Sequence, residues 1–236
     1  MLRGLSFGTA GGVTQLLLYV SRDADAAAVE REARGWLRGR ARAGDAADVP
    51  LPLLLLVVDG LPMGALVEAQ IEAADPSAPP LAQLAWQEER AHGLDLSCAA
   101  VVGGLSRPAA GGAASALGML QCAVGADAGC VTGAQLGAAL RDALAAFRRR
   151  LADAGSAPSL GDACYVRCFH EVGLLADNDR AALRRALRTL GSPDDAAGCA
   201  VVDLPVRRVA AGHARARLAV QVCVAACAGR ASEDNC

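Results

Sequence analysis

Two stretches of the chain, about 145 residues apart, share the same unusual ending. The first reads VVDGLP and then MGALVEAQIEA over 57–73, and the second reads VVDLP and then VRRVAAGHARARLAVQVCVA over 201–225. Each stretch predicts an apolar strand, a turn at Leu-Pro and a second, alternating strand. An internal repeat of this kind constrains the fold more than any other feature, because it predicts two related units.

The repeat extends upstream of both endings. LLLYVSRD (16–23) precedes the first copy as ACYVRCFHE (163–171) precedes the second, so that Tyr19 and Tyr165 occupy matching positions. Between the strands each copy has one amphipathic segment with an Asp or Asn before it as a potential N-cap. The first segment has Val29, Ala33, Trp36 and Leu37 after Asp23 or Asp25, and the second has Leu183, Ala186, Leu187 and Leu190 after Asn178. Both copies therefore predict strand, helix, strand, turn and strand.

Only the second copy has a front half. The stretches 96–105 and 119–124 predict two strands, and a long helix follows with Thr132 and Gln135 as a capping box and Gly155 as its stop. The apolar face of that helix consists of Leu136, Leu140, Leu144, Phe147 and Leu151. We therefore predict a complete unit over 94–228 and a partial unit, its back half, over 1–75. A linker rich in Pro and Ala over 76–93 and a polar tail over 229–236 complete the domain organisation.

The strands are apolar and the helices have one apolar face, which predicts an α+β fold in which a mixed sheet has its helices packed on one face. The order of elements, with GAALRDALAAFRRRLADAG, the Tyr-Val strand, VVDLP and a closing apolar-Gln-apolar step, resembles the RidA (YjgF, endoribonuclease L-PSP) family, whose fold is chorismate-mutase-like. Two such units in tandem, with LPMGALVEAQIEA closing the first, are more specifically similar to the C-terminal region of the eukaryotic diphthine–ammonia ligase family. This resemblance implies an accessory module in diphthamide biosynthesis, in which a histidine of translation elongation factor 2 is modified.

The resemblance places the ligase chemistry outside this chain. In that family an N-terminal ATP-pyrophosphatase domain holds the nucleotide with an SGGKDS loop, whereas this sequence has no such loop and all 23 of its basic residues are arginine. We therefore expect no cofactor here, and ATP only in a catalytic domain that this sequence does not include. A fragment of a longer ligase and a separately encoded module both fit these observations.

Stand-alone RidA proteins hydrolyse imines with an arginine before the Leu-Pro turn and a glutamate after it. Leu53 and Ala196 stand at the arginine positions, and Gln70 and Gln221 stand at the glutamate positions. Glutamine cannot act as a general base at neutral pH, so we expect no catalytic residue and a structural or binding role. An imine deaminase or a small-molecule-binding protein is the alternative. The candidates for lining a binding cleft are Gln70, Gln221, Arg167, His170 and Glu171.

Other polar residues give weaker signals. His170 ends the Tyr165 strand, where a solvated histidine is the favoured interpretation and a cleft residue the alternative. The arginines of the second repeat helix favour a solvated face, with an acidic partner surface as the alternative. Paired cysteines such as Cys164 and Cys168 would lie about 13 Å apart on a strand, too far for one metal ion. We therefore expect no metal site, and we expect the nine cysteines to be structural thiols of a cytoplasmic protein.

Composition limits the partners. A net charge of -2 and an aromatic content of 3% argue against nucleic-acid binding, and no apolar run is long enough for a membrane helix. The expected partners are a second copy of the chain or a catalytic pyrophosphatase domain, with elongation factor 2 as a further one.

Overall fold

The computed structural model describes residues 13–38, 53–73, 80–104, 115–125, 131–153, 160–188, 200–211 and 216–227. Within these ranges the chain adopts an α+β fold with two mixed sheets and three α-helices. The first elements are β1 (Val13–Ser21), α1 (Ala26–Arg38), β2 (Leu53–Val58), the short 3-10 turn η2 (Pro62–Gly64) and β3 (Val67–Ala73). They are followed by β4 (Pro80–Ala91), β5 (Leu94–Gly104), β6 (Ser115–Gly125), α2 (Gly133–Asp153) and β7 (Leu160–Glu171). The last are α3 (Asp177–Arg188), β8 (Ala200–Val206), β9 (Arg208–Ala211) and β10 (Ala216–Cys227).

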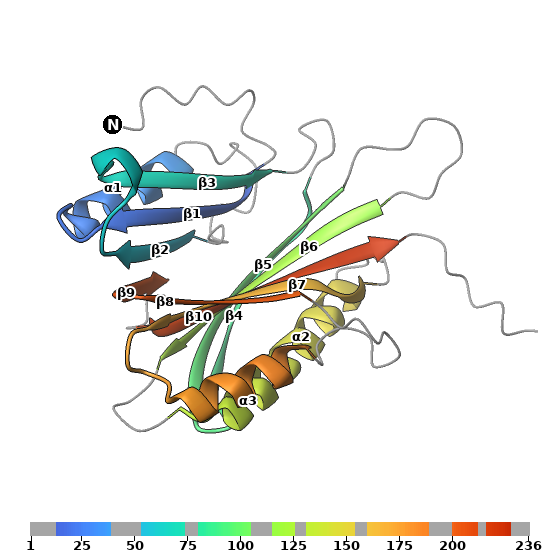
Figure 1. Ribbon diagram of the computed structural model, residues 1–236. Helices are drawn as coiled ribbons and strands as arrows, with labels where there is room; N and C mark the ends of the chain where they lie inside the picture. The colour runs from blue at the N-terminus through green and yellow to red at the C-terminus, as the bar shows by residue number, and fades with distance from the viewer. Residues whose placement is uncertain are drawn as a thin grey trace, which may run out of the picture.

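The two sheets pack face to face. One has four strands in the order β3-β1-β2-β9, and the other has six in the order β4-β5-β6-β10-β7-β8. The pairs β1–β2 and β7–β8 are parallel, and the other pairs are antiparallel. Figure 1 shows the four-stranded sheet on one side of the six-stranded sheet and the helices α2 and α3 on the other. Each sheet therefore has its helices on one face and the other sheet on the opposite face.

The topology confirms the repeated order of elements. β1, α1, β2 and β3 form a sheet order β3-β1-β2, and β7, α3, β8 and β10 form the matching order β10-β7-β8. The register agrees with the repeat in the sequence, because Val20 pairs with Val57 in the first copy and Val166 pairs with Val201 in the second. The elements β4, β5, β6 and α2 belong to the second copy alone.

The outer face of the four-stranded sheet packs against α1. The helix begins where predicted, because the Asp25 carboxylate accepts hydrogen bonds from the backbone N–H groups of Ala27 and Ala28, both at 3.0 Å. The predicted apolar face of α1 is confirmed. Its residues Val29, Ala33, Trp36 and Leu37 pack against Leu16, Leu18, Val20, Leu53 and Leu55 of β1 and β2.

A second core fills the space between the sheets, because alternate residues of each strand point to opposite faces. The residues of this core are Leu17, Leu54, Leu56, Ala123, Phe169, Val206, Val209, Ala216 and Ala219. They come from both sheets, so this core joins the inner faces of the two sheets.

The remaining face of the six-stranded sheet packs against α2 and α3. The predicted capping box of α2 is present: Gln135 N donates to Thr132 Oγ1 at 3.2 Å, and Thr132 N donates to Gln135 Oε1 at 3.1 Å. The two helices approach closely at Gly133 and Gly137. A Cβ atom at Gly137 would lie 2.4 Å from Ala186 Cβ, so this contact requires glycine.

One prediction fails along the predicted linker, because Pro80–Ala91 forms strand β4 and pairs with β5. The two strands are joined by His92 and Gly93, whose φ angles of 53° and 81° fit a two-residue hairpin turn. Two of the three prolines precede the strand and the third, Pro80, is its first residue, so the composition typical of a linker ends where the strand begins. The second unit therefore includes a strand that the sequence did not reveal.

Two smaller predictions also fail. Leu61 and Pro62 do form a turn, but Leu204 and Pro205 lie inside β8, because an edge strand tolerates a residue without an N–H group. Asn178 is not an N-cap, since α3 already begins at Asp177. The predicted tail 229–236 and the positions Gly155, Leu190, Ala196 and His213 lie outside the residues that the structure describes.

No helix in the described part of the chain is long and apolar enough to cross a membrane.

Candidate functional site at the seam between the sheets

Polar side chains from both sheets meet at one border of the core between the sheets. Arg167 of β7 donates from Nη1 to Gln70 Oε1 of β3 at 3.3 Å and from Nη2 to Tyr165 Oη at 2.9 Å, and it forms a close ion pair with Glu72. Tyr165 Oη donates to Glu72 Oε1 at 3.3 Å. We call these four residues, Gln70, Glu72, Tyr165 and Arg167, the seam. Two of the predicted cleft residues, Gln70 and Arg167, are therefore in direct contact.

The seam is held by strand geometry. Tyr165 and Arg167 are two positions apart on β7 and so point to the same face, as do Gln70 and Glu72 on β3. The guanidinium carbon of Arg167 also lies 5.0 Å from the centre of the Tyr165 ring, within the range of a cation–π interaction. Sequence analysis missed Glu72 and Tyr165 as partners, although the alternation in VEAQIEA was a signal that Gln70 and Glu72 share a face.

The seam is partly shielded from water, since the side chains of Arg167 and Glu72 are only 16% and 19% exposed. Burial, reinforced by the Glu72 carboxylate, raises the pKa of Tyr165 to about 12. Tyr19, at the matching position of the first repeat, also has its pKa raised by burial, with a smaller contribution from Glu68. Both phenols are therefore neutral hydrogen-bond donors at physiological pH and cannot serve as bases.

The ion pair between Arg167 and Glu72 limits the reactions that the seam could catalyse. Glu72 is the one carboxylate of the seam, and it is already bound by Arg167 and Tyr165. Arg167 stays charged, because its hydrogen bonds to Tyr165 and Glu72 raise its pKa against the opposing effect of burial. A ligand carboxylate would have to displace Glu72 to reach this guanidinium. The arrangement is thus better suited to joining two surfaces than to acid–base catalysis.

Gln221, the predicted counterpart of Gln70, lies elsewhere. It is fully buried between the sheets, where it donates from Nε2 to Gln121 Oε1 at 3.3 Å. Gln15 donates to the same oxygen at 3.3 Å, and Gln121 donates to the backbone oxygen of Leu53 at 3.1 Å. The side-chain oxygens of Gln15 and Gln221 accept no hydrogen bond from the described residues. This glutamine group connects the sheets through their buried core.

The predicted equivalence of Gln70 and Gln221 is therefore wrong. Gln70 pairs with Leu17 on β1, two positions before Tyr19, whereas Gln221 pairs with Arg167 on β7, two positions after Tyr165. The physical reason is the connection before each strand, which is a short turn in the first copy and includes β9 in the second.

His170 lies on the opposite face of β7 from the seam. Its Nε2 is 2.9 Å from Asp203 Oδ1 of β8, and both side chains are 2% exposed. Neither atom forms a hydrogen bond with a described residue, so the pair is a close contact. Arg180 Nη2 and Arg184 Nε of α3 donate to Asp203 Oδ2 at 3.2 and 3.1 Å. The favoured interpretation of His170 as a solvated histidine was wrong, because strand alternation points it beneath α3.

Sequence analysis also missed Asp203, although an acidic residue inside the apolar run AVVDLPV was a visible signal. Cys168 is its neighbour across β7 and β8 and is fully buried. Burial, followed by the Asp203 carboxylate, raises the pKa of the Cys168 thiol. Cys168, His170 and Asp203 therefore do not form a nucleophilic triad, because the thiol stays protonated and inaccessible.

The last predicted cleft residue, Glu171, pairs with Arg217 of β10 at 2.9 Å and takes no part in the seam. Among the described residues there is no group of His, Cys, Asp or Glu side chains that could hold a metal ion. The side chains of Cys98, Cys122, Cys168 and Cys223 are buried, as expected of structural thiols, and the Sγ atoms of Cys98 and Cys122 lie 3.1 Å apart.

The chain matches no protein-family model, no curated protein sequence and no solved structure.

Proposed function

We propose that this chain is a RidA-like tandem module that acts by docking to other proteins and not by catalysis. One observation carries the proposal: the six-stranded sheet has α2 and α3 on a single face, and its back half recurs as β1, α1, β2 and β3. A module built from one and a half such units fits the similarity to the C-terminal region of diphthine–ammonia ligases. In that role it would be a cytoplasmic accessory part in diphthamide biosynthesis.

The proposed lack of catalysis is supported by the positions at which the sequence resemblance places the RidA catalytic residues. Leu53 is buried in the sheet where an arginine would be needed. Gln221, which the strand pairing shows not to be the counterpart of Gln70, is buried and hydrogen-bonded to Gln121. Gln70 is exposed but has an amide in place of a carboxylate. ATP and its chemistry would then be supplied by a separate pyrophosphatase domain, and elongation factor 2 would be a further partner of the assembly.

The docking role can be tested by complementation. Cells whose own diphthine–ammonia ligase is reduced to its pyrophosphatase domain would receive this chain as a separate protein. We expect the modified histidine of elongation factor 2 to regain its amide, as measured by mass spectrometry, and the two proteins to copurify. Neither amidation nor copurification in cells that express both proteins would contradict the proposed role.

Self-association is the second form of docking that the proposal includes. Sedimentation velocity of the purified chain over a range of concentrations would measure it directly. A species heavier than the monomer supports self-association, and a monodisperse monomer at all concentrations would leave only docking to a different protein.

A second candidate function is imine hydrolysis, because the seam brings an arginine and a glutamate together. Arg167 would bind the substrate carboxylate and Glu72 would activate water, which requires their mutual ion pair to open. Ammonia release from a 2-iminoacid generated in solution tests this reaction, with Arg167→Ala as the matched control. We expect no release above the uncatalysed rate; release that disappears in R167A would replace the docking proposal by an enzymatic one.

A further inference from the structure

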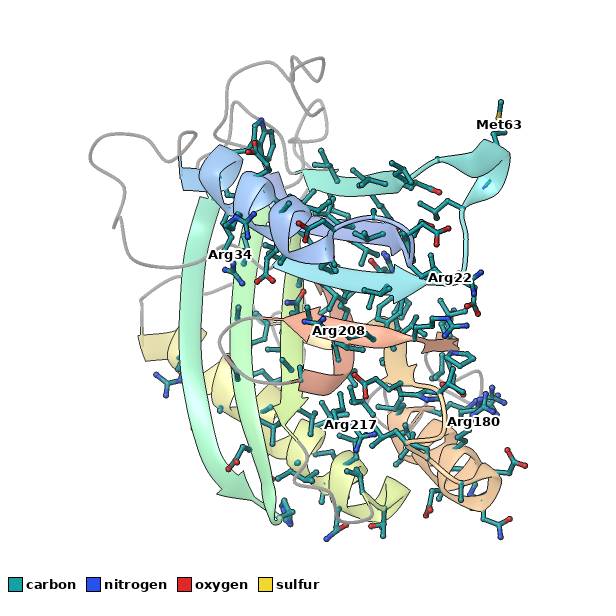
Figure 2. The ribbon with its side chains drawn as sticks, turned by 90° about the vertical axis from the view of Figure 1, so that its left-hand side faces the viewer. Arg22, Arg34, Met63, Arg180, Arg208 and Arg217 are labelled. Carbon is teal, nitrogen blue, oxygen red and sulfur yellow. The ribbon has the colours of Figure 1, made fainter. Side chains whose placement is uncertain are left out.

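The two copies of the repeat differ at the outer edge of one strand. β3 and β10 hold the same place in the topology, each antiparallel to the first strand of its copy. The other edge of β10 pairs with β6 along its whole length, whereas no described strand pairs with the other edge of β3. Accordingly, Val220, Gln221 and Val222 of β10 are buried, while Ala69 and Gln70 of β3 are exposed. Figure 2 shows β3 as the outermost strand of its sheet.

The outer edge of β3, with which no described strand pairs, presents backbone hydrogen-bonding groups. Ser21 N of β1 donates to Leu66 O at 2.9 Å, so the backbone of Leu66 points toward β1. Because these directions alternate along an antiparallel strand, the backbones of Val67, Ala69 and Ile71 point outward. Such a row can accept and donate hydrogen bonds to one more antiparallel strand.

The side chains of β3 determine which side chains would suit an added strand. On one face Val67 and Ile71 pack only partly against the core beneath α1, and Ala69 between them is exposed. On the other face Glu68, Gln70 and Glu72 point toward the six-stranded sheet. An added strand would therefore gain from apolar side chains on the α1 side and from basic or amide side chains beside the two glutamates.

We propose that the outer edge of β3 binds an antiparallel strand of another polypeptide, in which apolar residues alternate with basic or amide residues. The pairing of β10 with β6 in the second copy is the precedent within this chain. A second copy of this chain is a poorer occupant at this edge, because pairing β3 with β3 places four glutamate carboxylates on one sheet face at neighbouring cross-strand positions. The inference rests on the repeat and extends the docking part of the proposed function.

The test uses the full chain and two fluorescent peptides of ten residues, one alternating valine with arginine and one alternating valine with glutamate. Fluorescence anisotropy would measure binding of each. Ala69→Pro removes an outward N–H group without removing a hydrogen bond to β1, and Ala69→Val is the matched control that keeps the N–H group. We expect the arginine peptide to bind, A69P to weaken it by about tenfold or more, and A69V to leave it unchanged.

A charge variant keeps the test decisive if A69P folds poorly. Glu68→Lys is expected to weaken the arginine peptide by roughly twofold to fivefold and to strengthen the glutamate peptide. No saturable binding of either peptide, or equal binding by A69P and A69V when both are folded, would overturn the proposal. So would a dimer of the native chain that A69P abolishes, since a second copy would then occupy the edge. Because the peptides are independent of any ligase domain, failure here and failure of complementation are separate results.

Discussion

The two copies of the repeat have the same strand order but very different surroundings. In the second copy, β10 lies between β7 and β6 and is buried along its centre, and α3 packs against α2. In the first copy, β3 has one described neighbour, and α1 is the one described helix that packs on its sheet. The comparison teaches that local sequence specifies the β-α-β-β unit, whereas the burial of its residues depends on which elements are added beside it.

The aspartates of the shared VVD motif show this difference at a single position. Asp59 is 71% exposed and pairs with Arg207 and more loosely with Arg22. Asp203 is 2% exposed, and it is held by Arg180 and Arg184. The first is a surface ion pair, which contributes little to stability, and the second is a buried carboxylate that depends on its partners.

Replacing the two aspartates should give the largest contrast between the copies. We expect Asp203→Ala to lower the free energy of unfolding by about 3 kcal/mol, because it removes the charge-assisted hydrogen bonds that the buried carboxylate accepts from Arg180 and Arg184. We expect Asp59→Ala to cost less than about 1 kcal/mol, as usual for exposed pairs. Urea unfolding followed by circular dichroism measures both; similar losses for the two variants would contradict the assigned difference in burial.

Replacing a helix glycine by alanine should have opposite effects on stability in the two copies. At Gly137 of α2 a Cβ atom would overlap Ala186 of α3, whereas at Gly35 of α1 no atom lies within 4 Å of the added Cβ. We therefore expect Gly137→Ala to destabilise the chain by about 2 kcal/mol and Gly35→Ala to stabilise it by about 0.5–1 kcal/mol. Thermal unfolding of both variants would measure this. If both alanines stabilised, α2 and α3 would not pack as closely as described.

The N-termini of the repeat helices predict a smaller difference. Asp25 caps α1 with two hydrogen bonds, so Asp25→Ala should cost about 1 kcal/mol. Asn178 lies inside α3 and is exposed, so Asn178→Ala should change the free energy of unfolding by less than about 0.5 kcal/mol. Chemical unfolding of the pair measures this, and a larger loss for N178A would restore the N-cap that the sequence predicted.

The effects of the matching tyrosines, Tyr19 and Tyr165, on stability should differ least at neutral pH and most in alkaline solution. The pKa of Tyr165 is raised from 10.0 to about 12, so the unfolded chain loses this proton first as the pH rises. The resulting stability is fully present below pH 10 and is lost as the pH approaches 12. Phenolate absorbance should therefore show both tyrosines titrating late, and Tyr165→Phe should remove the later of the two steps. Alkaline unfolding of Y165F should depend less steeply on pH in this interval.

Periodicity was enough to predict the helices, because the apolar faces of α1 and α2 consist of apolar residues three and four positions apart. It could not place Leu204 and Pro205 inside β8, since whether a strand lies at a sheet edge depends on distant pairing. The seam was equally hidden, because Arg167 and Glu72 are 95 positions apart and share no local pattern. The sequence did show the chemical groups that form the seam. Alternation places Tyr165 and Arg167 on one strand face, and Glu72 lies two positions from Gln70.

Strand β9 has a consequence for how the chain is made. It completes the four-stranded sheet by pairing with β2, and the Arg207–Asp59 ion pair beside it joins residues 148 positions apart. At the usual rate of about 5–20 residues per second, a ribosome that has finished β2 needs on the order of 10 s to deliver β9. During that interval the apolar strand β2 lacks its neighbour β9. Factors that bind nascent chains should therefore affect the yield of folded protein more than the stability of the finished fold.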